Sequence, residues 1–359
     1  MRVLVVNNYN LHYSIYNWKA GLGGRHHLWG ASELERRGHA VDYLEFQKHT
    51  WLNRFVAPRW GDLDQQLRTC LSSSRYDLVF AAAGSVVMGL GFLRAAGLFR
   101  KPILAVIHHV PPVGRHSRFC LKGIDKIVCL SSRVAKHLCS TYPECRGKTA
   151  VAEWGWDLDF PLPETCLGRY VFSVGMSLRD YDTFCQALRG IGVPAVIACT
   201  AACAPKVPLD ENTELHLVEP ESNWVSERDL RKYYSECLAV AVPLGQMAQE
   251  CLAGLSSLLE GMANAKPVLA TRTPLLDIDI EKEGCGIWVE PGDVAGWGRA
   301  LRYVVDNPQA AREMGRRGRR LCELRYNIER FGDQIAHLLE AAVQPGRPNT
   351  PFSHGPASS

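Results

Sequence analysis

Short apolar runs along the chain alternate with longer segments in which apolar residues recur every three or four positions. The short runs predict strands that are buried on both faces, whereas the longer segments predict amphipathic helices. Regular alternation of the two is typical of βαβ units, which build parallel sheets. The pattern therefore predicts an α/β protein.

The predicted strands form two groups. The first group covers residues 2–7, 40–46, 77–82, 102–107, 126–130 and 149–152, and the second covers 169–175, 194–200, 214–219, 238–243, 266–271 and 286–290. Between the groups, residues 154–168 contain prolines and glycines, which is typical of an interdomain linker. We therefore expect two tandem Rossmann-like domains, over residues 1–160 and 161–343, that face each other across a cleft.

Three amphipathic segments follow the second group of strands, at residues 294–305, 309–324 and 328–342. The last of these helices could pack back on the N-terminal domain. Residues 344–359 are rich in Pro, Ser and Gly, which predicts a disordered tail. An uncharged run at residues 78–93 is shorter than the roughly 20 residues that span a bilayer. We expect it to form a buried strand and the start of a helix.

Composition narrows the class of protein only slightly. The chain has 359 residues, of which 47% are hydrophobic and 22% are charged, as in ordinary soluble globular proteins. The 13 cysteines include no Cys-x-x-Cys pair, which favours reduced, core-filling thiols over a zinc site. Because Met1 leads directly into a predicted strand, we expect no secretory signal and a cytoplasmic location.

Charge is divided unevenly along the chain. The net charge is +4 overall, but it is +8 over residues 1–165 and −4 over residues 166–359. A basic N-terminal domain would suit peripheral contact with an anionic membrane on the cytoplasmic face. A mixed, solvated surface is the alternative. The basic run at residues 312–321 favours a solvated helix face over a nucleic-acid site.

Two candidate ligand-binding features lie in the N-terminal half. Gly23 and Gly24 precede a helical segment, where a ligand could approach backbone amides and the positive end of the helix dipole. A flexible turn is the alternative. His108 and His109 follow a predicted strand, at the end from which α/β enzymes present side chains to ligands. Either could contact a substrate hydroxyl or be a capping or core residue, and no metal site is expected because adjacent side chains diverge.

A third candidate feature begins the second domain. Gly175 ends a predicted strand, and Arg179 stands at the start of the next helix. The fork of donors on a guanidinium suits a diphosphate. A surface ion pair with Asp180 or Asp182 is the alternative.

The fourth candidate is a helix that is predicted to begin near Gly254. The amide groups of Leu255, Ser256 and Ser257 would point out of its N-terminus, where an anion could bind. Glu260 shares one helical face with Ser256, so its carboxylate could accept hydrogen bonds from ribose hydroxyls, as acids do in dinucleotide-binding folds. The alternative is an acid that only complements the helix dipole.

Residues 243–293, followed by the basic helix, resemble the C-terminal half of family 4 retaining glycosyltransferases, which have the GT-B fold. The matching motifs are a Leu-Glu-Ala-Met-like helix at 259–262, a Gly-Pro-Val-like strand at 265–268 and a Gly-x-x-Val-x-Pro-Gly-Asp loop at 286–293. Residues 23–41 look like the Gly-Gly donor loop of that family, and residues 151–160 are similar to its interdomain Asn-Gly-Val-Asp segment. The resemblance covers nearly all of residues 1–340.

The resemblance implies a site for a nucleoside diphosphate sugar, most typically linked to UDP or GDP, with no metal and no other cofactor. Glu260 would hold the ribose, and Arg179 with the nearby helix amides would hold the diphosphate. Trp224 and Val225 would line the base pocket. The residues implied in donor binding are Gly23, Gly24, Gly175, Arg179, Trp224, Val225, Gly254, Leu255, Ser256, Ser257 and Glu260. Those implied in catalysis are His108, His109, Arg179 and Glu260.

Two departures from the family pattern affect these expectations. The family has two glutamates separated by seven residues, and the first would fall on Leu252. Backbone groups near residues 253–255 would then contact the donor sugar in place of a carboxylate. The usual Gly-Arg turn with a later lysine is replaced by Gly175-Met176 and Arg179, which leaves one arginine in the role of two cations.

The resemblance implies transfer of a hexose-type sugar to an acceptor hydroxyl, with retention at the anomeric carbon. The acceptor would be a saccharide, a lipid-linked molecule or a small molecule, and not a nucleic acid. Three alternatives stay open. They are a nucleotide-sugar epimerase or hydrolase of the same fold, a nicotinamide-dependent oxidoreductase, and a nucleotide-sugar-binding protein without turnover. The absence of a Gly-x-Gly-x-x-Gly fingerprint weakens the second, and Leu252 gives the third some weight.

Overall fold

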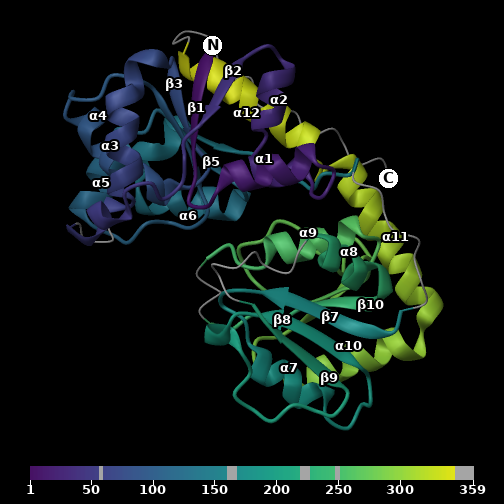
Figure 1. Cartoon of the computed structure of the whole chain (residues 1–359). Coiled ribbons are helices and arrows are strands. Elements are labelled where there is room, and N and C mark those ends of the chain that lie inside the picture. Colours follow the sequence, from purple (N-terminus) through teal and green to yellow (C-terminus); the bar gives the residue numbers. More distant parts are fainter. Residues whose placement is uncertain (56–59, 160–167, 219–226, 247–250, 344–359) are drawn as a thin grey trace.

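The computed structural model describes residues 1–55, 60–159, 168–218, 227–246 and 251–343. These residues form two domains, each built on a parallel six-stranded sheet. Figure 1 shows the N-terminal domain in purple and blue above the C-terminal domain in teal and green. Residues 160–167 of the predicted linker lie outside the described residues.

The N-terminal sheet contains the first six strands. They are β1 (Arg2–Val6), β2 (Ala40–Tyr43), β3 (Leu78–Ala81), β4 (Ile103–Ile107), β5 (Lys126–Cys129) and β6 (Thr149–Val151), in the order β2-β1-β3-β4-β5-β6. All residues of β3 and β4 are buried, which explains their uninterrupted apolar sequences. Each strand overlaps one that the sequence predicts.

The C-terminal sheet repeats this architecture. Its strands are β7 (Tyr170–Gly175), β8 (Ala195–Cys199), β9 (Thr213–Leu217), β10 (Cys237–Val242), β11 (Val268–Thr271) and β12 (Gly286–Val289), in the order β12-β11-β10-β7-β8-β9. All pairs are parallel. The prediction of two Rossmann-like domains is therefore confirmed.

Helices cover the faces of both sheets. In the N-terminal domain they are α1 (Leu11–Lys19), α2 (Ala31–Arg36), α3 (Leu63–Ser72), α4 (Met88–Ala95), α5 (Arg115–Lys122) and α6 (Ser132–Thr141), with short 3₁₀ helices η1 (Arg25–Leu28), η2 (Thr50–Phe55), η4 (Ser73–Arg75), η5 (Gly84–Val86) and η6 (Pro143–Lys148). Later in the chain they are α7 (Tyr181–Leu188), η7 (Ala201–Cys203), α8 (Glu227–Glu236), α9 (Leu255–Ala263), α10 (Val294–Asp306), α11 (Pro308–Leu324) and α12 (Ile328–Val343).

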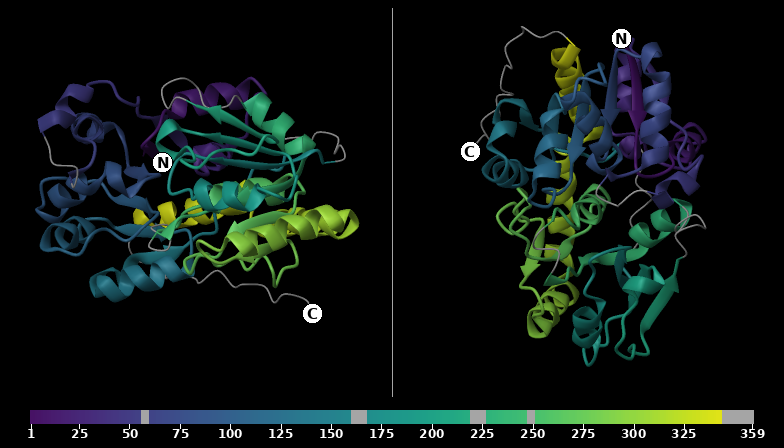
Figure 2. Two further views of the ribbon diagram at one scale, coloured as in Figure 1. Left: turned by 90° about the horizontal axis from the view of Figure 1, so that it is seen from below. Right: turned by 90° about the vertical axis from the view of Figure 1, so that its left-hand side faces the viewer.

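The last helix returns to the N-terminal domain. Figures 1 and 2 show α12 in yellow reaching from the second domain into the first, where it contacts α2, β3, β4 and β5. The contact with α2 is close because two glycines meet there: a Cβ added to Gly30 would lie 2.7 Å from the Cα of Gly332. The C-terminal helix therefore connects the two domains.

The segment between β1 and β2 contains a helix that was not predicted from the sequence. The residues before the Gly-Gly pair form α1, whose N-terminus is capped by the side chain of Asn10. After the pair, the predicted helix is interrupted. Trp29 and Gly30 adopt left-handed backbone conformations, with φ of 55° and 76°, and separate η1 from α2. Gly23 and Gly24 thus precede a single 3₁₀ turn.

The cysteines of the described residues are all free thiols, and most are buried. Burial raises the pKa of Cys120 and of Cys199 to about 11, so both thiols stay protonated and unreactive at neutral pH. Within the described residues, no helix is long and apolar enough to cross a membrane.

Candidate functional site

The strand order of the C-terminal sheet reverses between β7 and β10, which are neighbours although β8 and β9 separate them in sequence. Ligands of open α/β sheets bind beyond the carboxyl ends of the strands at such a point. The segments that leave β7 and β10 are joined there by two hydrogen bonds. Gly245 N donates to Leu178 O at 3.0 Å, and Asp180 N donates to Pro243 O at 3.2 Å. The topology therefore places a candidate ligand site beside these segments.

Arg179 connects this point to the start of α9. Its Nη2 donates to Ser257 Oγ at 2.9 Å and to Val174 O at 3.2 Å. Asp180 instead caps α7 by accepting a hydrogen bond from Thr183 N at 3.0 Å. The arginine is thus directed at the site rather than at its acidic neighbour.

Gly175 is required by the position of that arginine. A Cβ at Gly175 would lie 2.1 Å from Arg179 Nε, so any other residue would displace the guanidinium. The Nε atom is buried without a hydrogen-bond partner among the described residues. An unpaired buried donor costs about 1–3 kcal/mol, so a ligand that accepts a hydrogen bond from this Nε–H would remove that cost.

The N-terminus of α9 lies beside Arg179. Its N-cap residue, Gly254, has a φ of 78° and provides no side-chain cap. The first helical turn carries Leu255, Ser256 and Ser257, of which Ser256 is exposed and the other two are buried. The amides of a first turn and the helix dipole together favour an anion. The N-terminus of α9 and the guanidinium of Arg179 therefore both contribute positive electrostatic potential to the candidate site.

Glu260 lies one turn further along α9 and is half-buried. Its Oε2 accepts a hydrogen bond from the hydroxyl of Tyr234, a buried residue of α8. Burial, followed by the charge of Glu260, raises the pKa of Tyr234 well above its usual value, so the phenol remains a donor at neutral pH. Tyr234 was not singled out from the sequence.

The Gly-Gly pair of the N-terminal domain is in close contact with other residues of the protein. A Cβ at Gly24 would lie 2.6 Å from Nδ1 of His26, and the His26 ring stacks on Trp156 with the centroids 3.4 Å apart. Gly23 N donates to Asn17 O at 3.2 Å. The missing side chain at Gly24 therefore makes room for an imidazole of the same loop.

His108 and His109 occupy different environments. The Nε2 atom of half-buried His108 lies 3.1 Å from Ala82 O. Because a carbonyl only accepts, Nε2 must carry the proton, and Nδ1 is left as an acceptor. Burial lowers the pKa of His108, which favours this neutral form, and the ring packs edge-on against Trp29 at 5.0 Å. His109 is exposed.

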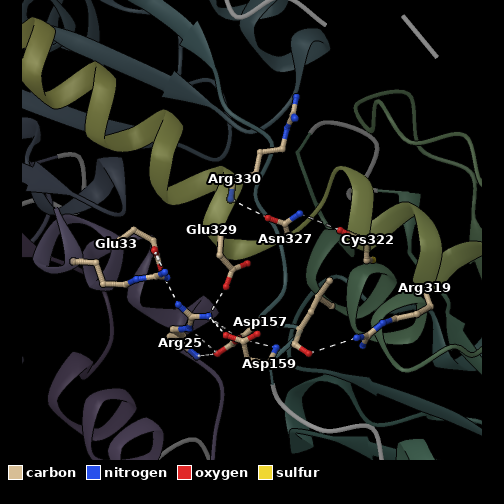
Figure 3. A network of polar contacts seen from close by, with 11 residues as sticks. Arg25, Glu33, Asp157, Asp159, Arg319, Cys322, Asn327, Glu329 and Arg330 are labelled. Carbon is tan, nitrogen blue, oxygen red and sulfur yellow. Dashed lines mark hydrogen bonds and ion pairs between the residues drawn. The ribbon is translucent and has the colours of Figure 1, made fainter. Parts of the chain in front are cut away.

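A cluster of charges around the buried Arg25 joins the N-terminal domain to the interdomain segment and to α12, near the Gly-Gly loop (Figure 3). Arg25, which is only 6% exposed, bonds to Glu33 of α2, to Asp157 and Asp159 of the interdomain segment, and to Glu329 of α12. Ligand atoms of Asp157, Asp159 and Glu329 lie within 4.8 Å of one another, a spacing that could hold a metal ion, but the guanidinium of Arg25 bonds to all three. The cluster therefore holds the Gly-Gly loop against the interdomain segment and the start of α12.

Two further contacts extend between the domains. Arg319 of α11 donates to Ala263 O, at the end of α9, at 2.9 Å, and to Leu158 O of the interdomain segment at 3.4 Å. Asp277 of the C-terminal domain accepts hydrogen bonds from the backbone and hydroxyl of Ser132, at the start of α6. Arg319 thus connects the end of α9, the helix that carries Glu260, to the interdomain segment.

The candidate residues fall into two sets. Those at the β7–β10 switch point are Gly175, Arg179, Gly254, Leu255, Ser256, Ser257 and Glu260. Those of the N-terminal domain are Gly23, Gly24, His108 and His109. Trp224 and Val225 lie outside the described residues. Leu252 is a half-buried residue that packs against two apolar clusters, one with members from both domains and one from the N-terminal domain.

Comparison with known proteins agrees with this architecture. Residues 212–321 match the family model of glycosyl transferases group 1, a segment that includes Tyr234 and Glu260. No curated protein matches the chain by sequence.

Solved structures similar to this chain extend over nearly its whole length. HepE from Anabaena in complex with UDP-glucose has a TM-score of 0.65 at 14% identity and covers 95% of this chain and 100% of its own. Sucrose-phosphate synthase from Thermosynechococcus elongatus has a TM-score of 0.62 at 14% identity and covers 95% and 98%. A glycosyltransferase from Rickettsia africae has a TM-score of 0.61 at 14% identity and covers 96% and 99%. The chain therefore has the GT-B fold.

Proposed function

We propose that the protein is a retaining glycosyltransferase of the family 4 type, which transfers a hexose-type sugar from a nucleoside diphosphate sugar to an acceptor hydroxyl. The observation that carries this proposal is the convergence of Arg179, the first turn of α9 and Glu260 at the switch point of the C-terminal sheet. The match of residues 212–321, which include α9 and Glu260 but not Arg179, to glycosyl transferases group 1 supports it. So does the similar fold of a protein described in complex with UDP-glucose.

The donor would lie with its diphosphate against the amides of residues 255–257 and the guanidinium of Arg179. Glu260, one turn away on α9, would then accept hydrogen bonds from the ribose hydroxyls. Trp224 and Val225 remain proposed residues of the base pocket, and UDP or GDP the proposed carrier. From the other domain, His108 would accept a hydrogen bond from a hydroxyl of the transferred sugar through its unprotonated Nδ1.

Chemistry at this site would depend on stabilising the leaving group. When the bond between the sugar and the diphosphate breaks, negative charge grows on the phosphate oxygens. Helix amides and an arginine that are already in place stabilise that charge by several kcal/mol without reorganising. The leaving phosphate would take the proton of the acceptor hydroxyl on the same face of the sugar. We propose that this positive potential takes the place of a metal ion.

The acceptor is proposed only by class. A saccharide, a lipid-linked molecule or a small molecule would approach from the N-terminal domain, and no nucleic acid is involved. The excess positive charge of residues 1–165 supports peripheral contact with an anionic membrane on the cytoplasmic side.

A second candidate function is nucleotide-sugar binding without turnover. It is favoured by Leu252, which takes the place of the first family glutamate and packs against an apolar cluster of the N-terminal domain. Donor turnover separates the two candidates, because a binding protein would show a donor-dependent rise in stability and no product.

The proposal is tested by a donor screen followed by a turnover assay. The purified chain would be melted in the presence of UDP-, GDP-, ADP- and dTDP-sugars, and a true donor at a hundred times its dissociation constant stabilises by about 2.7 kcal/mol. The stabilising donor is then incubated alone and with saccharide and lipid acceptors, and the anomeric configuration of the product is read by NMR. Product without acceptor would indicate a hydrolase, and an inverted product would refute retention. Glu260→Gln should reduce the donor-dependent stabilisation without abolishing nucleotide binding, whereas Glu283→Gln, at an exposed carboxylate of the same domain, should leave that stabilisation unchanged.

A further inference from the structure

Two adjacent tyrosines of α8 point to different partners. Tyr234 is 3% exposed and donates its hydroxyl hydrogen bond to Oε2 of Glu260. Tyr233 is half-buried, and its hydroxyl lies 3.1 Å from Nε2 of His216. Both rings pack on Phe172 of β7, Tyr233 in a stack and Tyr234 edge-on, each with the centroids 5.1 Å apart. Both tyrosines therefore pack on Phe172, but their hydroxyl groups contact different residues.

The contact with Tyr234 restricts a side chain that is otherwise flexible. A glutamate on a helix has three rotatable bonds, and freezing them when a ligand binds weakens the affinity. A charged hydrogen bond from a buried phenol holds the carboxylate before the ligand arrives. The phenol also requires an acceptor, which keeps this oxygen of Glu260 in the form that can receive hydroxyl donors. The pair therefore presents a fixed acceptor.

The hydrogen bond between Tyr234 and Glu260 lies next to the proposed diphosphate site. Tyr234 lies on α8, which precedes β10 in the chain, and Glu260 lies on α9, which follows it; β10 is a strand at the switch point. The α9 helix also carries Ser257, which holds Arg179. A shift of Glu260 would move its carboxylate relative to the proposed diphosphate site on the same helix.

We propose that Tyr234 is a positioning residue that determines sugar specificity in the nucleotide: it holds the carboxylate of Glu260 where the ribose hydroxyls reach it, and so favours ribonucleotides over 2′-deoxyribonucleotides. This inference rests on the proposed function. A purely structural Tyr234 would join α8 to α9 and would affect both kinds of nucleotide equally.

The test measures the affinity of nucleoside diphosphates by isothermal titration calorimetry. The probes are UDP, GDP and ADP, and then the 2′-deoxy form of whichever binds best. Tyr234→Phe keeps the ring and removes the hydroxyl, and Tyr233→Phe is the matched control on the same helix. We expect Tyr234→Phe to weaken the ribonucleotide roughly tenfold, as for loss of a hydrogen bond to a charged group, and to leave the 2′-deoxynucleotide within about twofold. Tyr233→Phe should leave both within about twofold.

A double-mutant cycle separates positioning from folding. In the Glu260→Gln background, Tyr234→Phe should have little further effect on ribonucleotide affinity, because there is no carboxylate left to position. Equal losses for ribo- and deoxyribonucleotide, or no loss, would overturn the inference while leaving the proposed function intact. If the wild-type chain binds no nucleoside diphosphate and no nucleotide sugar, both the inference and the proposed function are wrong.

Discussion

Replacing Arg25 by methionine should destabilise the protein far more than replacing a nearby arginine of the same interface. The side chains of Glu33 and Asp157, which Arg25 contacts, are 6% and 4% exposed. Those of its other two partners, Asp159 and Glu329, are 80% and 37% exposed. Water can solvate the second pair of carboxylates when the guanidinium is removed, but it cannot reach the first.

The magnitude follows from that difference. Removing one partner of a buried ion pair costs about 3–5 kcal/mol where it leaves an uncompensated buried charge; here Asp157 loses its guanidinium, while Glu33 keeps its ion pair with Arg36. Arg37 provides the control, because its ion pair with Asp333 joins α2 to α12 with both side chains substantially exposed, at 31% and 57%. Such a pair contributes at most about 1 kcal/mol. Arg25→Met should therefore lower the free energy of unfolding several times more than Arg37→Met.

Urea denaturation followed by tryptophan fluorescence and by circular dichroism measures both variants. Similar losses of stability in Arg25→Met and Arg37→Met would refute the reasoning, because the buried carboxylates would then not depend on the guanidinium. A transition that differs between the two signals would show that the chain does not unfold in one cooperative step.

The pH dependence of the Arg25→Met variant gives a second check. Burial raises the pKa of Glu33, and the charge of Arg25 opposes that rise. Without the guanidinium, the pKa of Glu33 in the folded protein should rise further above its unfolded value. The folded state then binds protons more readily than the unfolded state. Lowering the pH from 8 towards 5 should therefore reduce the difference in free energy of unfolding between the variant and the wild type. A loss of unfolding free energy that stays constant or grows over this range would show that it does not come from the buried charge of Glu33.

Three other predictions concern the proposed donor site and the domain interface. Gly175→Ala should weaken nucleoside diphosphate binding at least tenfold in calorimetry, because its Cβ would displace Arg179; unchanged affinity would mean that the arginine does not contact the ligand. Asp277→Asn should cost about 0.5–1 kcal/mol in urea unfolding by weakening the charged cap of α6, and no measurable cost would show that this interdomain contact is not maintained in solution. Donor binding should be the same with and without EDTA, since amides and Arg179 would provide the positive potential, and a loss on chelation would point instead to a metal.

The fold could be predicted from the sequence because its signal is local. Parallel strands that are buried on both faces read as apolar runs, and each strand from β1 to β12 overlaps such a run. The start of α9 after Gly254 could be predicted for the same reason, since a glycine in the left-handed conformation there separates the loop from the helical periodicity.

The contacts that shape the site could not be predicted in this way. Arg25 meets Asp157 and Glu329 across 132 and 304 positions of the chain, and no periodicity relates residues so far apart. Tyr234 reads in sequence as one of two adjacent tyrosines on an amphipathic helix. Only the packing of α8 and α9 beside β10 determines which of them reaches Glu260.

A structure of the protein in complex with a nucleoside diphosphate tests the central claim most directly. We predict that the diphosphate oxygens lie within about 3 Å of the amides of residues 255–257 and of the Arg179 guanidinium, with the ribose hydroxyls on Glu260. A nucleotide bound elsewhere, or one whose phosphates lie away from the start of α9, would contradict the account.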